Sequence, residues 1–405
     1  MNSSAQQAAA AEAAVPERSG MGSVAILAIC QALGMSCMAL SITITALVGS
    51  SLAPTPALAT LPLALQFVAS ACVTIPASLF MGRFGRRAGF TLGSLLGIAG
   101  GALSCFAVFA ADFWLFCLGG AFLGGFATHV ALYRFAAADV AGAAYRSRAI
   151  SYVMVGGVVA AVLGPELAKW TKELFAPVLF AGGYAGVAVL AFLTLALIQF
   201  AALPKPLSRH DRSSGRPLAE IVRQPALIVA VLCAMVAYGA MNLIMVSTPL
   251  AMVACAHPFE TAAFVIQWHV VGMYAPSFVT GHIIHRFGAP RVIAAGGVMI
   301  LACAAINLTG VEVLQFWAAL VLLGIGWNFM FVGGTALLTE TYRVEEQARV
   351  QAFNEFMVFG TTAVTALASG AIFSALGWQW VNLGTVVPVL IATAAALALH
   401  RRRRA

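Results

Sequence analysis

The chain has 405 residues, of which 61% are hydrophobic and 9% are charged, and its net charge is +8. Soluble domains carry about a quarter charged residues, so this composition excludes an ordinary water-soluble protein. The positive charge does not indicate nucleic-acid binding, because the basic residues lie beside the ends of apolar segments. The expected surroundings are a lipid bilayer, and nucleic acid is not an expected partner.

The apolar segments have the length of membrane-spanning helices. A bilayer requires about 20 apolar residues per helix, which leaves room for roughly twelve spans. Backbone groups in lipid must be paired internally, and these runs lack the strict alternation of barrel strands. We therefore expect an all-α membrane protein with twelve transmembrane helices. The expected spans are 22–49, 57–81, 88–110, 113–136, 149–170, 177–203, 225–250, 260–284, 290–309, 312–340, 347–374 and 378–399.

A long polar stretch, residues 204–224, separates two similar halves. Arg83-Phe84-Gly85 recurs at Arg286-Phe287-Gly288, an offset of 286 − 83 = 203 residues. The same offset aligns further residues elsewhere in the halves, which indicates a duplicated six-helix unit. We expect two pseudo-symmetric six-helix bundles, as in many secondary transporters. The expected domains are an N-terminal tail (1–21), the first bundle (22–203), a linker (204–224), the second bundle (225–399) and a basic tail (400–405).

The distribution of basic residues predicts the orientation of the chain. Most arginines fall in alternate connections or in the C-terminal tail, whereas the opposite connections hold Lys169 and Lys172. The positive-inside rule therefore predicts that both termini and the linker are cytoplasmic. The first 20 residues lack the charged start of a signal peptide, so the first span is expected to be an uncleaved anchor. Eight cysteines without a CxxC pair argue against a disulfide framework or a zinc ribbon.

Four soft donor residues lie on two consecutive expected helices. Met241 and Met245 are four residues apart, as are His269 and Met273, so each pair shares one helix face. Counted from the inner ends of their spans, Met241 and His269 fall in one layer. Thioether and imidazole groups without carboxylates are the donors that monovalent copper prefers. The residues themselves leave two interpretations open: a metal path through the membrane, or helix packing and a non-metal cavity.

Other polar residues in the spans also have two interpretations. His129 could relay protons or be a packed, hydrogen-bonded histidine. Glu166 could couple transport to protons or simply pair with Lys169 three residues later. Trp327 and Asn328 are expected to line the cavity.

Two further expectations concern charged residues near span ends. Arg134 is expected to pair with Asp139, and Glu355 is expected to snorkel or to pair with Arg349. No carboxylate stands out as a coupling group. The sequence also lacks a phosphate-binding glycine loop followed by Lys-Ser/Thr, and no nucleophile–base spacing is recognisable. The chain is therefore not expected to be an enzyme.

The segment Ser78-Leu-Phe-Met-Gly-Arg-Phe-Gly-Arg-Arg87 resembles the signature loop of the major facilitator superfamily. The usual pattern has Gly and Asp where this chain has Ser78 and Gly82, and the second copy has His285 in place of Asp. The resemblance implies the twelve-helix fold and a gating role for this loop, while its basic residues are equally consistent with a positive-inside anchor. The residues to which this role is assigned are Arg83, Gly85, Arg86, Arg87, Arg286 and Gly288.

The methionine and histidine motifs resemble those of the CcoA-like copper importers within this superfamily, as do residues 267–278 and 326–329. This resemblance implies copper ligation by Met241, Met245, His269 and Met273, with Cys233 and Cys255 as auxiliary thiols. It also implies a transporter of the bacterial inner membrane that supplies copper for haem–copper oxidase assembly. Copper would be the cargo, with no permanently bound cofactor, and a cytoplasmic copper chaperone would be a partner.

Two other functions remain open at this level. The same branch includes riboflavin importers, and the same fold includes proton-coupled exporters of drugs or metabolites. These cargoes would need aromatic or amide contacts, which Trp268, Tyr274, Trp327 and Asn328 could supply. A different class of function, a non-transporting membrane sensor or assembly factor, would be favoured by a large added soluble domain.

Overall fold

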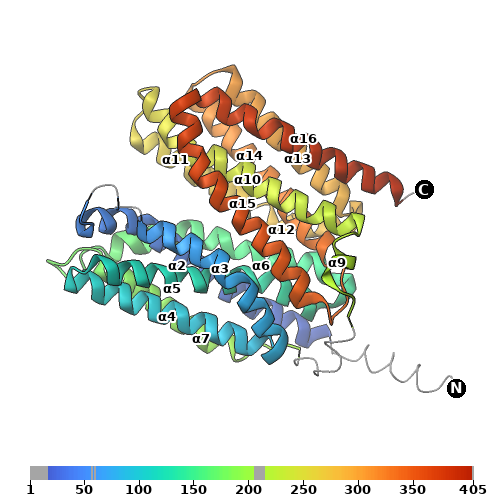
Figure 1. Cartoon of the computed structure of the whole chain (residues 1–405), viewed down its shortest axis with the longest axis horizontal. Helices are drawn as coiled ribbons and strands as arrows, with labels where there is room; N and C mark the ends of the chain where they lie inside the picture. Colours follow the sequence, from blue (N-terminus) through green and yellow to red (C-terminus); the bar gives the residue numbers. More distant parts are fainter. Residues whose placement is uncertain (1–16, 56–57, 59–60, 205–214, 404–405) are drawn as a thin grey trace.

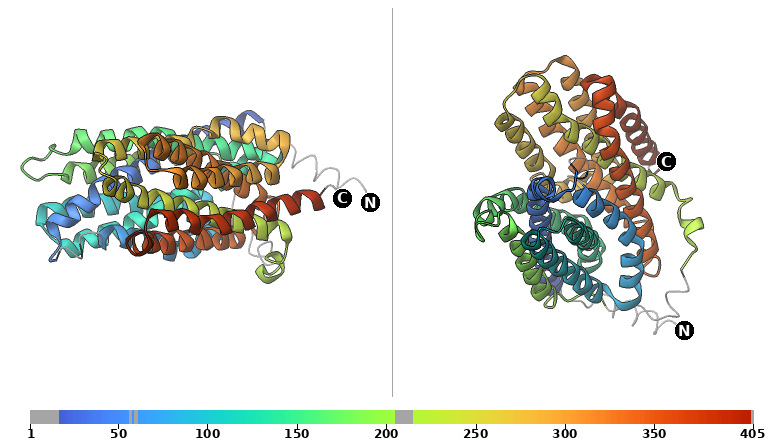
Figure 2. Two further views of the ribbon diagram at one scale, coloured as in Figure 1. Left: turned by 90° about the horizontal axis from the view of Figure 1, so that it is seen from above. Right: turned by 60° about the vertical axis from the view of Figure 1, so that its left-hand side comes forward.

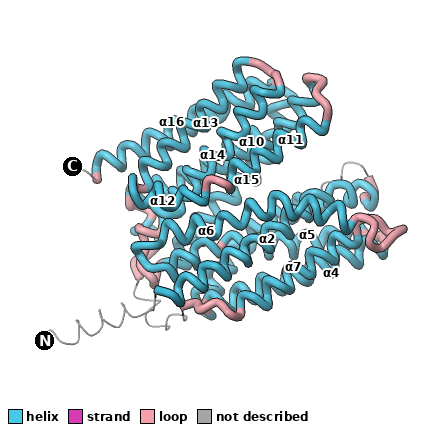
Figure 3. The backbone as a smooth tube through the Cα atoms, turned by 180° about the vertical axis from the view of Figure 1, so that it is seen from behind, coloured by secondary structure: helices cyan, strands magenta, loops and turns pink. Residues whose placement is uncertain are grey.

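The computed structural model describes residues 17–55, 58, 61–204 and 215–403, and these residues form helices and no strands (Figure 3). The segments form helices because a continuous apolar run in lipid must pair its own backbone groups. The helices are α2 (Glu17–Leu52), α3 (Leu61–Phe84), α4 (Arg86–Ala110), α5 (Phe113–Ala131), α6 (Tyr133–Thr171), α7 (Ala181–Ile198), α9 (Leu218–Ile221), α10 (Pro225–Ala254), α11 (Phe259–Tyr274), α12 (Ser277–Phe287), α13 (Ala289–Thr309), α14 (Val313–Leu338), α15 (Gln347–Leu376) and α16 (Trp378–Arg402).

Ten stretches of helix in the described residues are long and apolar enough to cross a membrane. The fourth stretch, Phe113–Gly142, joins α5 to the start of α6, and the fifth, Ala144–Thr171, is the rest of α6. Gly142 has φ +68° and marks the bend between them. The two remaining expected spans correspond to the α11–α12 pair and to α15. The all-α fold with its membrane-spanning helices is confirmed.

One expected span, 260–284, is broken in the structure into α11 and α12. Pro276 lies at the break and has no N–H to donate to the preceding turn. The Asn328 side chain of α14 replaces part of the lost bonding: its Nδ2 donates to the Met273 carbonyl at 2.7 Å and to Ser277 Oγ at 2.6 Å. Thr280 Oγ1 in turn donates to Asn328 Oδ1 at 2.7 Å. The amide thus holds the two helix ends together.

The helices form two groups, α2–α7 and α10–α16, which lie side by side (Figures 1 and 2). They are called the N half and the C half below. The start of α2 and the end of α16 lie at the same end of the molecule, here called the terminus end. The halves meet where α3 packs against α15 and where α6 packs against α11, α12 and α14.

The repeated Arg-Phe-Gly sequence adopts the same conformation in both halves. Gly85 between α3 and α4 has φ +92°, and Gly288 between α12 and α13 has φ +84°. Other residues rarely adopt such angles. In each copy the arginine lies over its neighbouring phenylalanine ring, at 5.2 Å for Arg83 and 5.3 Å for Arg286. The matching turns support a duplicated unit, and both lie at the terminus end.

Candidate functional site

A cluster of aromatic rings lies between α10, α11 and α14. Trp327 stacks on Phe331 at 5.0 Å between ring centres and meets Tyr238 and Tyr274 edge-on at 5.2 and 5.6 Å. Tyr238 also meets Phe331 at 4.9 Å. Gly157 of α6 lies against Tyr274 so closely that a Cβ there would overlap the ring. The rings therefore belong to the C half, and the N half touches them directly.

A buried ion pair lies beside this cluster and joins the two halves. Arg134 of α6 donates through Nη2 to Glu355 Oε1 of α15 at 2.5 Å, and their side chains are 5% and 2% exposed. The Arg134 guanidinium also lies 4.4 Å from the centre of the Phe331 ring. Asn354 Nδ2 donates to the same oxygen of Glu355 at 2.7 Å. We call the rings and this ion pair the central cluster: Arg134, Tyr238, Tyr274, Trp327, Phe331 and Glu355.

The expected partners of these charges were wrong. Arg134 does not pair with Asp139, whose partner is Arg86, at 2.8 Å. Glu355 neither snorkels nor pairs with Arg349, since it is buried against Arg134. Both true partners are separated by long stretches of sequence, 53 and 221 residues. Local sequence spacing cannot reveal such partners, because they depend on how distant helices pack against each other.

The signature loop forms a contact between the halves at the terminus end. Arg86 Nη2 donates to Asp139 Oδ2 at 2.8 Å and to Gln351 Oε1 of the C half at 2.7 Å. Gly82 lies so near α15 that a Cβ would come within 2.8 Å of Ala348 Cβ. Arg87 instead bonds the Ala201 carbonyl of its own half at 2.8 Å. Of the loop residues, Arg86 and Gly82 therefore contact the opposite half.

A third ion pair joins the end of the linker to the loop before α15. Arg216 donates through Nε and Nη2 to the two oxygens of Glu346, each at 2.8 Å. The backbone N–H groups of Arg216 and Arg343 also donate to this carboxylate, both at 2.9 Å. Hydrogen bonding from the Arg216 guanidinium lowers the pKa of Glu346 to about 2. Linker residues 205–214 lie outside the described residues.

The four proposed soft ligands lie on α10 and α11. Met241 and Met273 are buried, and Met245 is half-buried. Met241 and Met245 follow Tyr238 by three and seven residues, so they share its helix face. His269 precedes Tyr274 by five residues, or about 140° around the helix, and its Nδ1 lies 2.8 Å from the Leu320 carbonyl of α14. The imidazole and the Tyr274 ring therefore both contact α14, at different points along it.

The two cysteines assigned to copper lie far from each other along α10. Cys233 is buried and its Sγ donates to the Ala392 carbonyl of α16 at 3.7 Å. Cys255 is exposed at the end of α10, 22 residues or about 33 Å along the helix from Cys233. Within the described part of the chain, no three His, Cys, Asp or Glu side chains are arranged to hold a metal ion.

His129 and Glu166 lie outside the central cluster. His129 Nδ1 lies 2.8 Å from the Gly125 carbonyl of its own helix, and its ring packs against Gly93 of α4. It is therefore buried within the N half. Glu166 accepts a hydrogen bond from Lys169 at 2.7 Å, and both side chains are exposed, by 37% and 69%. Of the two interpretations of Glu166, proton coupling and pairing with Lys169, this contact agrees with the pairing.

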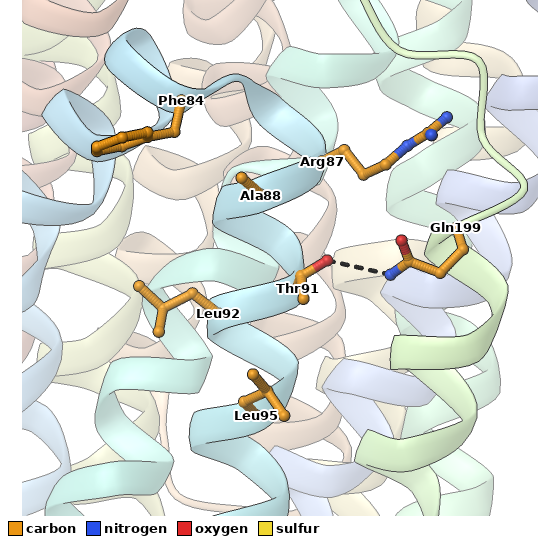
Figure 4. A pocket seen from close by; sticks show the side chains of 7 residues that line it. All are labelled: Phe84, Arg87, Ala88, Thr91, Leu92, Leu95 and Gln199. Carbon is orange, nitrogen blue, oxygen red and sulfur yellow. Dashed lines mark hydrogen bonds between the residues drawn. The ribbon is translucent and has the colours of Figure 1, made fainter.

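A groove of about 520 Å³ lies between α4 and α7, away from the central cluster (Figure 4). Arg87 lies at one end of it, and Thr91 accepts a hydrogen bond from Gln199 Nε2 at 3.0 Å beside it. The remaining lining is apolar and includes the exposed Leu92 and Leu95. Because these apolar walls are exposed, the groove is expected to face lipid.

Sequence reasoning named Tyr274, Trp327 and Asn328 as cavity residues but missed Tyr238 and Phe331. The spacing of Trp327 and Phe331, four residues on one helix, was an available signal of a shared face. Tyr238 carried no comparable signal. Trp268, the remaining aromatic candidate, is 41% exposed and meets Trp317 rather than the central cluster.

Comparison with known proteins gives a similar protein over most of the chain. The Riboflavin transporter RfnT of Brucella anthropi is 43% identical over 363 residues, covering 89% of this chain and 91% of the relative. An uncharacterized MFS-type transporter of Bacillus subtilis, YdeG, is 27% identical over 385 residues, covering 90% and 89%. The E. coli fucose:proton symporter FucP has a similar fold, with a TM-score of 0.76 at 15% identity and coverage of 95% and 99%.

The expectation of copper import is wrong. The curated relative at 43% identity is a riboflavin transporter, which favours the riboflavin alternative. Neither copper as the cargo nor a copper chaperone as a partner is supported by this finding. The MxxxM and HxxxM spacings correctly identified shared helix faces but not the cargo, since thioether and imidazole groups also serve as packing in apolar helices.

The family assignment rests on almost the whole sequence. The sequence profile of the Major Facilitator Superfamily matches residues 24–311 and, in a second match, residues 230–405. The all-helical fold and the solved structures of similar fold agree with this match. The chain is therefore a multi-pass membrane protein and a transporter of small solutes, not an enzyme. It belongs to the Major Facilitator Superfamily.

Proposed function

We propose that this protein imports riboflavin across the bacterial inner membrane by alternating access of its two halves. The observation that supports this most strongly is the 43% identity to the riboflavin transporter of Brucella anthropi, over nine-tenths of both chains. Such coverage includes both halves and the helices that carry the central cluster.

The aromatic rings of the central cluster fit this substrate class. Riboflavin has a planar, fused three-ring system with polar edges and a hydroxylated side chain. Flat rings stack on aromatic side chains, which Tyr238, Tyr274 and Trp327 supply. The indole Nε1 of Trp327 is buried and has no hydrogen-bond partner among the described residues, so it is a donor available to a ring carbonyl or nitrogen when the cluster rearranges around substrate.

The orientation of the protein in the membrane follows from the distribution of its basic residues. The basic loops and the start of α2 lie at the terminus end, and the positive-inside rule assigns this end to the cytoplasm. The hydrogen bonds from Arg86 to Gln351 and from Arg146 to the Thr339 carbonyl join the halves at that end. The described conformation would then be the one closed toward the cytoplasm, which is the state that receives a solute from outside.

The test is uptake of radiolabelled riboflavin by a bacterial strain that cannot synthesise it and lacks its own riboflavin importer. Expression of this chain should restore growth on low riboflavin and produce saturable uptake that excess unlabelled riboflavin inhibits. Radioactive copper uptake in the same cells serves as the comparison. An absence of riboflavin uptake by a protein that is present in the membrane would refute the proposal.

A further inference from the structure

The Arg134–Glu355 ion pair is the fully buried charge pair that joins the halves among the described residues. Glu355 lies nine residues beyond Glu346, or about 13 Å deeper along α15. Its partner belongs to the other half, and their direct bond is made at 2.5 Å. Alternating access requires the halves to separate at the terminus end. That movement separates Glu355 from Arg134.

When the halves separate, Arg134 keeps more stabilising contacts than Glu355 does. Arg134 also donates through Nη1 to the Ala131 carbonyl at 2.6 Å and lies 4.6 and 4.4 Å from the Phe135 and Phe331 ring centres. The Ala131 and Phe135 contacts belong to its own half and persist when the halves separate. Glu355 retains the amide of Asn354. A buried carboxylate without a cation is costly, so Glu355 is the group that binds a proton.

Other ionisable groups face this pair from the neighbouring helices. The phenol groups of Tyr238 and Tyr274 lie within electrostatic range of Arg134, and Tyr238 also within range of Glu355. Neither phenol brings a positive charge that could replace Arg134. The other ion-paired carboxylates among the described residues are more exposed or lie in loops, as Glu166 and Glu346 do.

We propose that Glu355 is the proton-carrying residue of the transport cycle and that riboflavin enters together with protons. The inference rests on the proposed function and adds its energy source. A proton from outside converts the Glu355 carboxylate to the acid, which breaks the ion pair and releases the contact between the halves. The proton leaves to the cytoplasm, and the carboxylate then pairs with Arg134 again. Phe331 links this step to the substrate, because its ring contacts both Trp327 and Arg134.

The experiment uses the full chain in proteoliposomes and compares two assays. Counterflow exchanges labelled for unlabelled riboflavin and needs no net proton movement. Accumulation is driven by a pH gradient with the acidic side outside, where one pH unit supports at most about tenfold accumulation per proton. The wild-type protein should do both, and a protonophore should abolish accumulation. Glu355→Gln should retain counterflow and lose accumulation, whereas the exposed control Glu166→Gln should retain both.

Each other outcome is also decisive. Accumulation by Glu355→Gln, or wild-type accumulation that a protonophore leaves unchanged, overturns the proposal. Loss of both assays in a well-folded Glu355→Gln protein assigns Glu355 to translocation itself and also overturns it. If that variant aggregates, the double variant Arg134→Gln, Glu355→Gln replaces it, because it leaves no unpaired charge. It should likewise retain counterflow and lose accumulation.

Failure of the substrate assignment is distinguishable from failure of this inference. Without riboflavin counterflow in the wild-type protein, the proposed function fails. Proton binding is then measured without substrate, as the infrared carbonyl band of a protonated carboxyl group that forms on acidification. The band should be present in the wild-type protein and absent from Glu355→Gln, and its persistence in the variant overturns the assignment.

Discussion

Arg86 in the N half and Gln351 in the C half are joined by a hydrogen bond of 2.7 Å between Nη2 and Oε1. The same guanidinium is held in place by Asp139 through Nε at 3.2 Å and Nη2 at 2.8 Å. Arg86 is thus fixed by its own half and donates to the other. The family's signature loop therefore supplies a contact between the halves at the terminus end.

Replacing Gln351 with Ala should favour the state that is open at the terminus end. A hydrogen bond to a charged group contributes about 1.5–3 kcal/mol, so the open population should rise by roughly tenfold or more. The measurement is maleimide labelling of a cysteine at Ala348, in a chain whose exposed Cys72 and Cys255 are Ser. Gln351 also donates to the Tyr342 hydroxyl at 2.7 Å, so Tyr342→Phe is the matched control. Equal labelling rates in all three proteins would contradict the prediction.

Enlarging Gly82 should prevent closure at this end. A Cβ at Gly82 would come within 2.8 Å of Ala348 Cβ across the interface, and overpacking costs about 1–3 kcal/mol. Gly82→Leu should therefore reduce riboflavin uptake by roughly tenfold. Gly360 of α15 has nothing within 4 Å of an added Cβ, so Gly360→Leu should transport normally. Normal uptake by Gly82→Leu would show that the close approach does not limit the cycle.

The Arg216–Glu346 pair should make stability sensitive to acid. The pKa of Glu346 is lowered to about 2 in the folded protein from an ordinary 4.5. The ionised carboxylate therefore stabilises the fold above about pH 4.5, and this contribution disappears as the pH falls toward 2. Solvent screening at the loop limits it to the order of 1–2 kcal/mol. Thermal unfolding at decreasing pH should lower the Tm of the wild-type protein more than that of Glu346→Gln, and parallel curves would contradict this.

Removing the central indole should weaken riboflavin binding. Stacking of a flat ring on an aromatic side chain contributes about 1–3 kcal/mol, so Trp327→Leu should raise the KM for riboflavin by roughly five- to a hundredfold. Trp114 is 63% exposed on the N half, and Trp114→Leu is the control for general loss of a tryptophan. An unchanged KM in Trp327→Leu would show that this ring does not contact the substrate.

Replacing the methionines should leave transport intact. Met241→Leu combined with Met273→Leu conserves volume, and such substitutions in packed interiors usually cost less than about 1.5 kcal/mol. Riboflavin uptake should stay within about twofold of the wild-type rate, and copper accumulation should not respond to expression of either protein. Copper accumulation that depends on these thioethers would restore the metal interpretation.

The helices were predictable from the sequence because their signal is local. Each expected span overlaps a helix or helix pair, and the turns at Gly85 and Gly288 followed from the repeated motif. The break at Pro276 was missed, although a proline inside an apolar run was visible. Proline interrupts a helix in lipid where a neighbour supplies the missing bonds, and that neighbour, Asn328, lies 51 residues beyond Ser277.

The site was less predictable because it depends on contacts between the halves. Arg134 has an acidic residue nearby in sequence, yet its partner is 221 residues away. Tyr238 lies on α10, and only folding brings its ring against Trp327 and Phe331 of α14. The methionine and histidine spacing was real, but spacing on one helix does not determine which way a face turns. The proposal for the cargo rests on a relative that is a riboflavin transporter.

The Asn328 amide has a mechanical consequence for the α11–α12 break. A joint whose free carbonyl is bonded by a third helix can bend without exposing an unpaired backbone group to lipid. The two helices of this span, α11 and α12, can therefore tilt separately while both stay hydrogen-bonded to α14. Such a hinge is useful in a transporter when the two ends of one span pack against different helices, because each end can then move with the helix that it contacts.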